Sequence, residues 1–172
     1  MDKGADVNVQ GDDGVTALML TCEKGHVDVA LALMDKGADV NLQGSHGHTA
    51  LMNACSIGHL KLALALMDKG ADVKLQVTDG TTALMNACSI GHLEIAMAIV
   101  DKGADIDRQK RDRNTAFSWA CKNGHVDVAL ALMEKGADIH WRGQRGESVL
   151  PYVDEGKLPI LHQALVEKGV HL

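Results

Sequence analysis

The chain has 172 residues, 46% of them apolar and 23% charged, so it can bury a substantial core and does not have the composition of a disordered protein. Its formal net charge of −6 argues against nucleic acid as a partner, because non-specific binding to nucleic acid depends on attraction to phosphate. No apolar run reaches the roughly 18 residues needed to cross a bilayer, and the first residues do not show a basic region followed by an uninterrupted hydrophobic stretch. We therefore expect a cytoplasmic or nucleocytoplasmic protein without membrane insertion.

An internal repeat of 33 residues organises the whole chain. The string Lys-Gly-Ala-Asp recurs with this period, starting at Lys3, Lys36, Lys69, Lys102 and Lys135. The spacing predicts a partial repeat at 1–10, full repeats at 11–43, 44–76, 77–109 and 110–142, and a degenerate C-terminal capping repeat at 143–172. Because Met1 aligns with Met34, the chain begins inside a repeat, and we expect it to be a fragment of a longer array.

Each full repeat predicts two short helices, as the repeat at 11–43 illustrates. Thr16 can cap the first helix through its hydroxyl, and apolar or small residues follow it up to Cys22. Gly25 then ends that helix. The second helix, residues 27–34, is apolar on almost every side, so neighbouring repeats must cover it.

A polar turn segment separates one repeat from the next. Residues 43–47 contain two glycines among polar residues, which predicts a projecting hairpin. Within the second helices, we expect Leu64 and Ile95 to be buried by the stack. The last repeat departs from the pattern, because Pro151 and Pro159 predict a shortened first helix.

The repeat resembles a known family. The pattern G-x-T-A-L-M, then G-H, then M-D-K-G-A-D-V-N begins at Gly14, and the string TALMNACSIGHL occurs from both Thr49 and Thr82. This pattern closely resembles the ankyrin repeat consensus over essentially the whole chain. The resemblance implies an all-α solenoid of stacked helix-turn-helix units with projecting β-hairpin loops. It also implies that hairpin tips and first helices form a concave groove that binds partner proteins.

Residues with chemical potential fall at repeat positions, which favours structural roles. The cysteines are 33 residues apart and occupy a position where ankyrin repeats place a small buried residue, namely Cys22, Cys55, Cys88 and Cys121. A histidine follows each cysteine by four residues, but two ligands are too few for a metal site. We find no nucleophile motif and no phosphate-binding glycine loop. The sequence therefore predicts no metal, no cofactor and no enzyme activity.

Binding specificity is expected at the positions that vary between repeats. The candidate partner-binding residues lie at hairpin tips or on first helices, with Trp141 in addition: Ser45, His46, His48, Asn53, Thr78, Asp79, Thr81, Asn86, Arg111, Asp112, Arg113, Asn114, Trp119, Trp141 and Arg145. Charge along this row changes sign, from Asp12 and Asp13 to a basic region that also contains Arg108 and Lys110. Both tryptophans fall in the basic region, and exposed tryptophan and arginine are typical of binding hot spots.

These features predict a monomeric scaffold or adaptor whose partner is another protein or peptide, acidic and with an apolar anchor. Two alternatives remain open at this stage. The chain could be the regulatory ankyrin segment of a larger enzyme, channel or ubiquitin-ligase subunit. It could also be an engineered array without a natural partner, since the second and third repeats are nearly identical.

One modification is suggested by the family resemblance. Ankyrin loops that end in Asp-Val-Asn are substrates of a cytosolic asparaginyl hydroxylase that prefers a leucine upstream, and Leu33 precedes Asn41 at a similar spacing. Asn41 is the candidate for hydroxylation, and Asn8 is a weaker one. The alternative is that Asn41 completes the hydrogen bonds of its loop.

Overall fold

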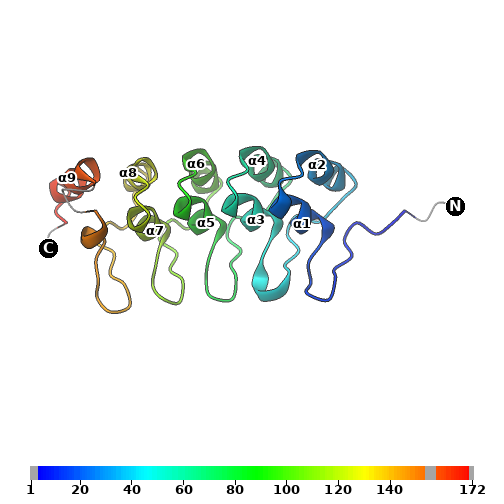
Figure 1. Ribbon diagram of the computed structural model, residues 1–172, viewed down its shortest axis with the longest axis horizontal. Coiled ribbons are helices and arrows are strands. Elements are labelled where there is room, and N and C mark those ends of the chain that lie inside the picture. The colour runs from blue at the N-terminus through cyan, green and yellow to red at the C-terminus, as the bar shows by residue number, and fades with distance from the viewer. Residues whose placement is uncertain (1–3, 154–157, 171–172) are drawn as a thin grey trace.

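The computed structural model describes residues 4–153 and 158–170; the parts of the predicted partial repeat and cap at 1–3, 154–157 and 171–172 lie outside them. Within these ranges the chain forms two layers of helices, with loops that project from one side (Figure 1). The first layer contains α1 (Ala17–Lys24), α3 (Ala50–Ser56), α5 (Ala83–Ser89) and α7 (Ala116–Lys122). The second layer contains α2 (Val27–Asp35), α4 (Leu60–Asp68), α6 (Leu93–Asp101), α8 (Val126–Glu134) and α9 (Pro159–Glu167).

Threonine hydroxyls begin the first helices, as the sequence predicts. Each hydroxyl accepts a hydrogen bond from the backbone N–H three residues later, at 3.2–3.3 Å, and the four residues are Thr16, Thr49, Thr82 and Thr115. At the other end of α1, Gly25 adopts a left-handed conformation with φ of 73°. A Cβ on Gly25 would also lie 2.9 Å from the His59 ring of the next repeat, so this glycine is needed for both its backbone angle and its size.

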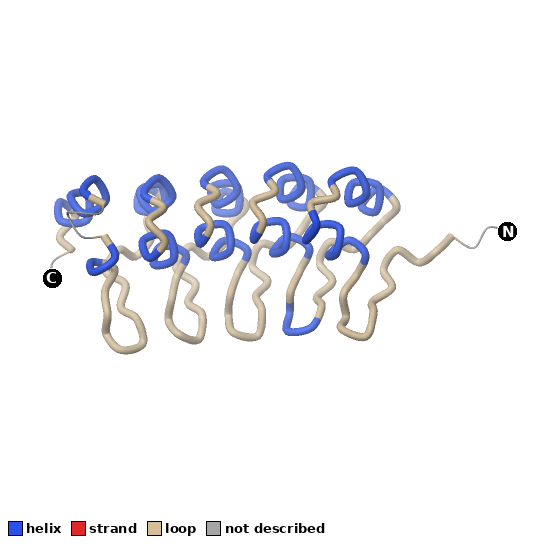
Figure 2. The backbone as a smooth tube through the Cα atoms, in the orientation of Figure 1, coloured by secondary structure: helices blue, strands red, loops and turns tan. Residues whose placement is uncertain are grey.

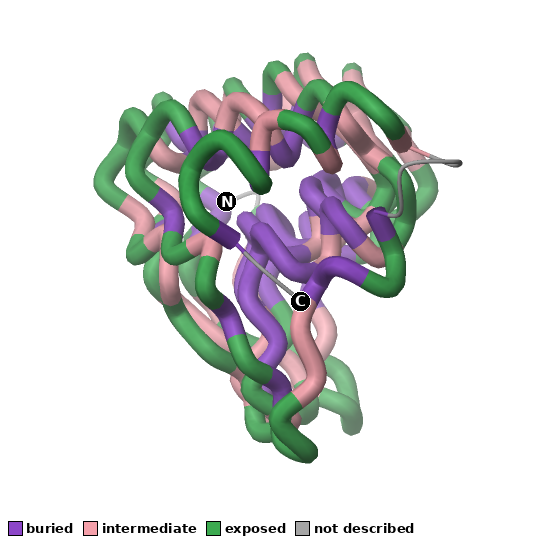
Figure 3. Tube along the Cα trace, turned by 90° about the vertical axis from the view of Figure 1, so that its left-hand side faces the viewer, coloured by how far each residue is buried: buried purple, intermediate pink, exposed green. Residues whose placement is uncertain are grey.

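Stacking of successive repeats buries the second helices. Leu62, Ile95 and Val128 occupy equivalent positions and are at most 1% exposed, whereas Val29, in the first helix pair, is 52% exposed. The burial of this position therefore depends on the helix pair of the preceding repeat. Figure 3 shows the buried positions gathered between the two layers. The prediction for Ile95 is confirmed, but that for Leu64, on α4, is wrong, because Leu64 is 39% exposed.

Periodic polar contacts connect each repeat with the next. On the second helices, a lysine pairs with an aspartate of the preceding repeat in Lys69–Asp35 at 2.9 Å, Lys102–Asp68 at 3.3 Å and Lys135–Asp101 at 2.7 Å. These pairs are exposed, so each contributes about 0–1 kcal/mol. The stack therefore depends mainly on its apolar interior.

The projecting loops turn back on themselves without forming a strand ladder (Figure 2). In the described residues the only β-bridge joins Gln76 and Thr82, and Ser45–Gly47 is a short 3-10 helix. Two backbone hydrogen bonds close each hairpin, for example Val77 N–H to Thr81 O at 3.0 Å and Gly80 N–H to Val77 O at 2.8 Å. The loops are thus held by turn geometry and by contacts between neighbours.

The C-terminal repeat has a shortened first helix, as its prolines predict. A 3-10 turn at Leu150–Tyr152 stands where the other repeats have an α-helix. The Lys122 Nζ of α7 lies 4.6 Å from the ring centroid of Trp141 and 5.3 Å from that of Tyr152. The cation–π contact with Tyr152 joins the last full repeat to the degenerate one.

Replacing Ile95 by Ala should lower the free energy of unfolding by about 2–4 kcal/mol, because it leaves a cavity between repeats. Leu64→Ala is the matched control on the neighbouring α4, and it should cost clearly less since Leu64 is partly solvated. Urea melts followed by circular dichroism would measure both. Equal losses in the two variants would contradict the stacking account.

Candidate functional site

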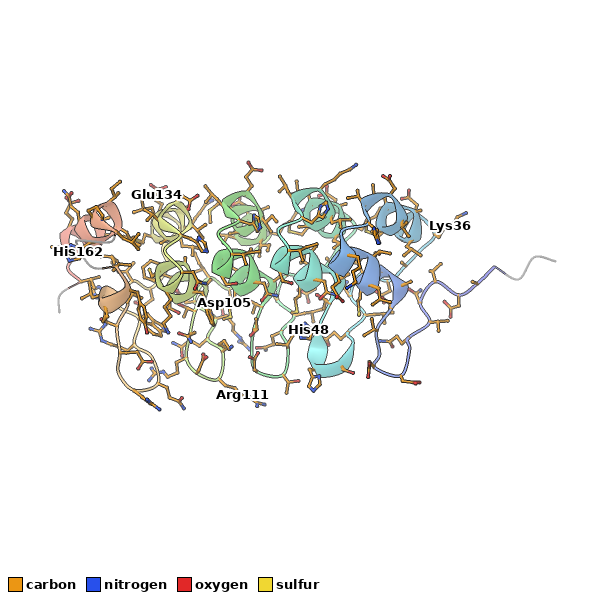
Figure 4. All side chains as sticks on the ribbon, viewed as in Figure 1. Lys36, His48, Asp105, Arg111, Glu134 and His162 are labelled. Carbon is orange, nitrogen blue, oxygen red and sulfur yellow. The ribbon has the colours of Figure 1, made fainter. Side chains whose placement is uncertain are left out.

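The candidate site is the surface formed by the loop tips and the adjoining exposed side of α1, α3, α5 and α7, hereafter called the groove. Its tips comprise residues 12–15, 45–48, 78–81, 111–114 and 144–147. Figure 4 shows Arg111 at a loop tip and His48 on another loop of the same row, both below the helices. The groove collects variable side chains from all the repeats onto one surface.

The structure exposes about half of the residues predicted for this surface. The exposed ones are Ser45, His46, His48, Thr78, Arg111, Arg113 and Arg145. The partly buried ones are Asn53, Asp79, Thr81, Asn86, Asp112 and Trp119. The remaining two are buried and require a correction.

Trp141 and Asn114 are not available to a partner. Trp141 is 2% exposed, and its Nε1–H donates to the Arg113 carbonyl at 2.6 Å. Asn114 is 7% exposed, and its Oδ1 accepts hydrogen bonds from Lys122 Nζ at 2.6 Å and Ser118 Oγ at 3.3 Å. Both side chains are buried and make these hydrogen bonds inside the fourth repeat, so the prediction that they contact a partner is wrong.

The basic region is also smaller than its sequence indicates. Lys110 Nζ pairs with Asp79 Oδ2 at 2.9 Å and lies 5.6 Å from the Trp119 ring centroid, so its charge is used internally. Arg108 donates through Nε to Gln76 Oε1 at 3.4 Å and does not line a hollow of the groove. The cations that remain exposed at the tips are Arg111, Arg113 and Arg145.

Neighbouring tips are held together by backbone hydrogen bonds. The Ser45 N–H donates to Asp13 O at 2.7 Å, the Thr78 N–H to His46 O at 2.7 Å, and the Arg111 N–H to Asp79 O at 2.8 Å. These bonds fix the spacing of the tips before any partner arrives. Little ordering entropy then has to be lost on binding, which favours affinity.

Asp79 is the most strongly held carboxylate at the tips. Hydrogen bonds from Thr81, together with Lys110, lower the pKa of Asp79 to about 2. Asp79 is therefore ionised at neutral pH and keeps Lys110 neutralised. The Asp79–Lys110 pair is therefore already formed when a partner binds.

Arg113 stands out for its backbone. It has φ of 65° at a position where the other four loops have glycine: Gly14, Gly47, Gly80 and Gly146. A left-handed arginine is strained by about 1 kcal/mol or more. The hydrogen bond from Trp141 to the Arg113 carbonyl helps to hold this conformation, which presents a cation where every other tip has no side chain.

Two apolar hollows lie in the groove over the first three repeats. One, of about 290 Å³, is lined by Val15, Met19 and Leu20 together with polar groups that include His48. The other, of about 300 Å³, is lined mainly by His46, His48, Val77 and Thr81. Our sequence analysis missed Val77. The signal was present, because the equivalent positions in the other loops hold Gly11, Gly44, Lys110 and Gly143.

The cysteines and histidines form no chemical centre in the described residues. All four thiols are buried, and burial raises the pKa of Cys22, Cys55 and Cys121 to about 12 and that of Cys88 further still. Such thiols stay protonated at neutral pH and are poor nucleophiles. No group of three or more metal-binding side chains is found in residues 4–153 and 158–170.

The Asn41 side chain completes a bridge between loops. Its Oδ1 accepts the Asp72 N–H at 2.7 Å, and its Nδ2 donates to Gly70 O at 3.0 Å. Asn8 makes the equivalent bonds to Asp39 and Gly37 at 2.7 and 3.3 Å. These contacts support the structural role, while hydroxylation of Asn41 stays a prediction.

Comparison with known proteins assigns the repeat. The sequence matches the family model for ankyrin repeats, in three copies, over residues 1–77 and 69–142. A search of curated proteins gives no match. None of the helices in the described part of the chain has the length and apolar character needed to cross a membrane.

We predict that the folded protein reacts slowly with a thiol reagent at pH 8, because burial keeps all four thiols protonated and covered. Intact-mass measurement should show four labels only after denaturation. Gln144→Cys, at an exposed tip, is the positive control and should add one rapidly labelled thiol. Rapid labelling of native cysteines would overturn the structural assignment.

The hydroxylation hypothesis predicts a single added oxygen at Asn41 after incubation with the asparaginyl hydroxylase. Peptide mass spectrometry would locate it, and the peptide containing Asn53 serves as an internal control. Because both polar groups of Asn41 are hydrogen-bonded, the reaction requires local opening of the loop. An unmodified Asn41 peptide would leave only its bridging role.

Proposed function

The chain belongs to the ankyrin repeat family, and we propose that it is a protein-interaction module whose groove binds an extended segment of a partner protein. Ankyrin repeats are generally non-catalytic modules that bind proteins. The observation that carries the proposal is the combination, in one groove, of apolar hollows with exposed arginines.

The two ends of the groove suit different parts of the partner. The hollows beside Leu20 and Val77 suit apolar side chains, since their rims offer few charged groups. Arg111, Arg113 and Arg145 suit carboxylates at the other end. We therefore propose a partner segment with an apolar anchor over the first three repeats and acidic residues over the fourth and fifth.

Trp119 lies on α7, in the same repeat as Arg111 and Arg113. It is partly buried, and Lys110 covers it from the side of the tips. Aromatic side chains that lose their remaining water on binding often carry a large share of the affinity. We propose that Trp119 contacts the middle of the bound segment.

We also propose the role of the whole chain from these features. A monomeric scaffold or adaptor in the cytoplasm, without catalysis of its own, fits a groove of this kind and four reduced, buried thiols. A regulatory ankyrin segment of a larger protein would use the groove in the same way. The chemistry of the bound segment is common to both roles.

Peptides selected by display on the folded protein should combine acidic residues with an apolar anchor. Against such a peptide, Arg111→Glu with Arg113→Glu should slow association and flatten its salt dependence, because exposed charges act mainly on encounter. Trp119→Ala should speed dissociation, with a loss of about 2 kcal/mol or more. Stopped-flow fluorescence at several salt concentrations would measure both rates.

Two controls keep this test sharp. Lys61→Glu reverses an exposed charge on α4, in the second layer of helices, and should leave association nearly unchanged. Arg113→Gly removes the charge and relieves the left-handed strain, so its effect on binding is not confounded by unfolding. Unchanged binding in the Arg111 and Trp119 variants, with loss of binding on mutating Asp12 and Asp13, would place the site at the opposite end.

A further inference from the structure

A second periodic bridge connects the loops that follow the second helices. The described residues contain four such junctions between one loop and the next, each of which is called a step. In three of the four steps, a side-chain oxygen accepts a backbone N–H of the next repeat. Asn8 Oδ1 accepts the Asp39 N–H and Asn41 Oδ1 accepts the Asp72 N–H, both at 2.7 Å. Asp107 Oδ1 accepts the Asp138 N–H at 2.8 Å. The backbone N–H at this repeat position can therefore donate to either an amide oxygen or a carboxylate oxygen.

The remaining step has no such oxygen. Lys74 occupies the position of Asn8, Asn41 and Asp107, and a lysine ammonium can donate but not accept. Within residues 4–153 and 158–170, neither the Asp105 N–H nor the Gly103 carbonyl has a hydrogen-bond partner. The two peptide groups that a side chain could bridge elsewhere are therefore available here.

The surroundings of the Asp105 N–H select for negative charge. A hollow of about 370 Å³ is lined by Val73, Lys74, Thr82, Gly103, Ala104, Asp105 and Arg108. Its charges are two cations and one carboxylate, and Oδ1 of that carboxylate, from Asp105, accepts the Asp107 N–H at 3.2 Å. One added carboxylate would balance the site. Figure 4 shows Asp105 nearer the helices than Arg111, which lies at a loop tip.

We propose that this step of the stack binds a carboxylate group of another molecule, which accepts the Asp105 N–H and lies between Lys74 and Arg108. The ligand oxygen takes the place that Asp107 Oδ1 takes one repeat later. An acidic side chain and a C-terminal carboxylate share this chemistry. The hollow shares no lining residue with the two apolar hollows of the groove, so the site is independent of the proposed partner segment.

Amide NMR titration of the ¹⁵N-labelled protein tests the assignment with three small probes. N-acetylaspartate N-methylamide offers a side-chain carboxylate, N-acetylglycine a terminal one, and N-acetylasparagine N-methylamide a neutral amide. The chemical shift of the Asp105 amide proton should move downfield and reach a plateau as either carboxylate probe is added. The probe that binds more tightly identifies the ligand as a side-chain carboxylate or a C-terminal one. The Asp72 and Asp138 amides should stay in place, because their N–H groups are already bonded.

Lys74→Asn is the matched variant, since it rebuilds the bridge that Asn41 makes one repeat earlier. It should shift the Asp105 amide without any probe and weaken carboxylate binding about tenfold or more, through the loss of one charge and one charge-assisted hydrogen bond. Arg108→Gln should also weaken binding while leaving the free Asp105 amide unshifted. The proposal is overturned if Asp105 responds no more than Asp72, if the neutral probe binds as tightly, or if Lys74→Asn binds like the parent.

Discussion

The whole structure depends on one constraint: no repeat can cover its own second helix. The residues at the position of Leu62, Ile95 and Val128 lose their contact with water only when a preceding helix pair lies against them, and Val29 shows the result when none does. Burial of apolar area is the dominant favourable contribution to folding, so stability grows with each added contact between repeats. The 33-residue period follows, because each repeat has to present the same face to the next.

This constraint turns small sequence differences into local chemistry. With helices and loops held at a fixed spacing, equivalent atoms meet in each step, and a side chain that departs from the pattern changes one defined contact. Asn41 accepts the backbone N–H of Asp72, whereas Lys74, at the equivalent position one repeat later, leaves the N–H of Asp105 without an acceptor in the described residues. Arg113 places a cation where the other tips have glycine. An array of near-identical units can therefore carry distinct sites.

Much of the fold could be predicted from the sequence, because its determinants are local and repeated. Threonine caps, the glycine after α1 and the prolines near the C-terminus act within a few residues of themselves, and the structure agrees with each. The burial of Trp141 was harder to predict. Its equivalents include the partly buried Leu42 and Leu75, but also the exposed Arg108, so the repeat pattern alone left the direction of the side chain open.

The candidate groove was harder still, because its character depends on contacts between residues far apart in the chain. Sequence can count the cations but cannot show that Asp79 neutralises Lys110, or that Lys122 is held by Asn114, Trp141 and Tyr152. The charge available to a partner is what remains after these internal pairs are formed. A cation with an internal partner must give up that contact before it can bind another carboxylate, which offsets the gain. Within residues 4–153 and 158–170, Arg111, Arg113 and Arg145 at the tips form no ion pair and bear no such cost. These three side chains, rather than the net charge of the chain, therefore set the preference of this end of the groove for carboxylates.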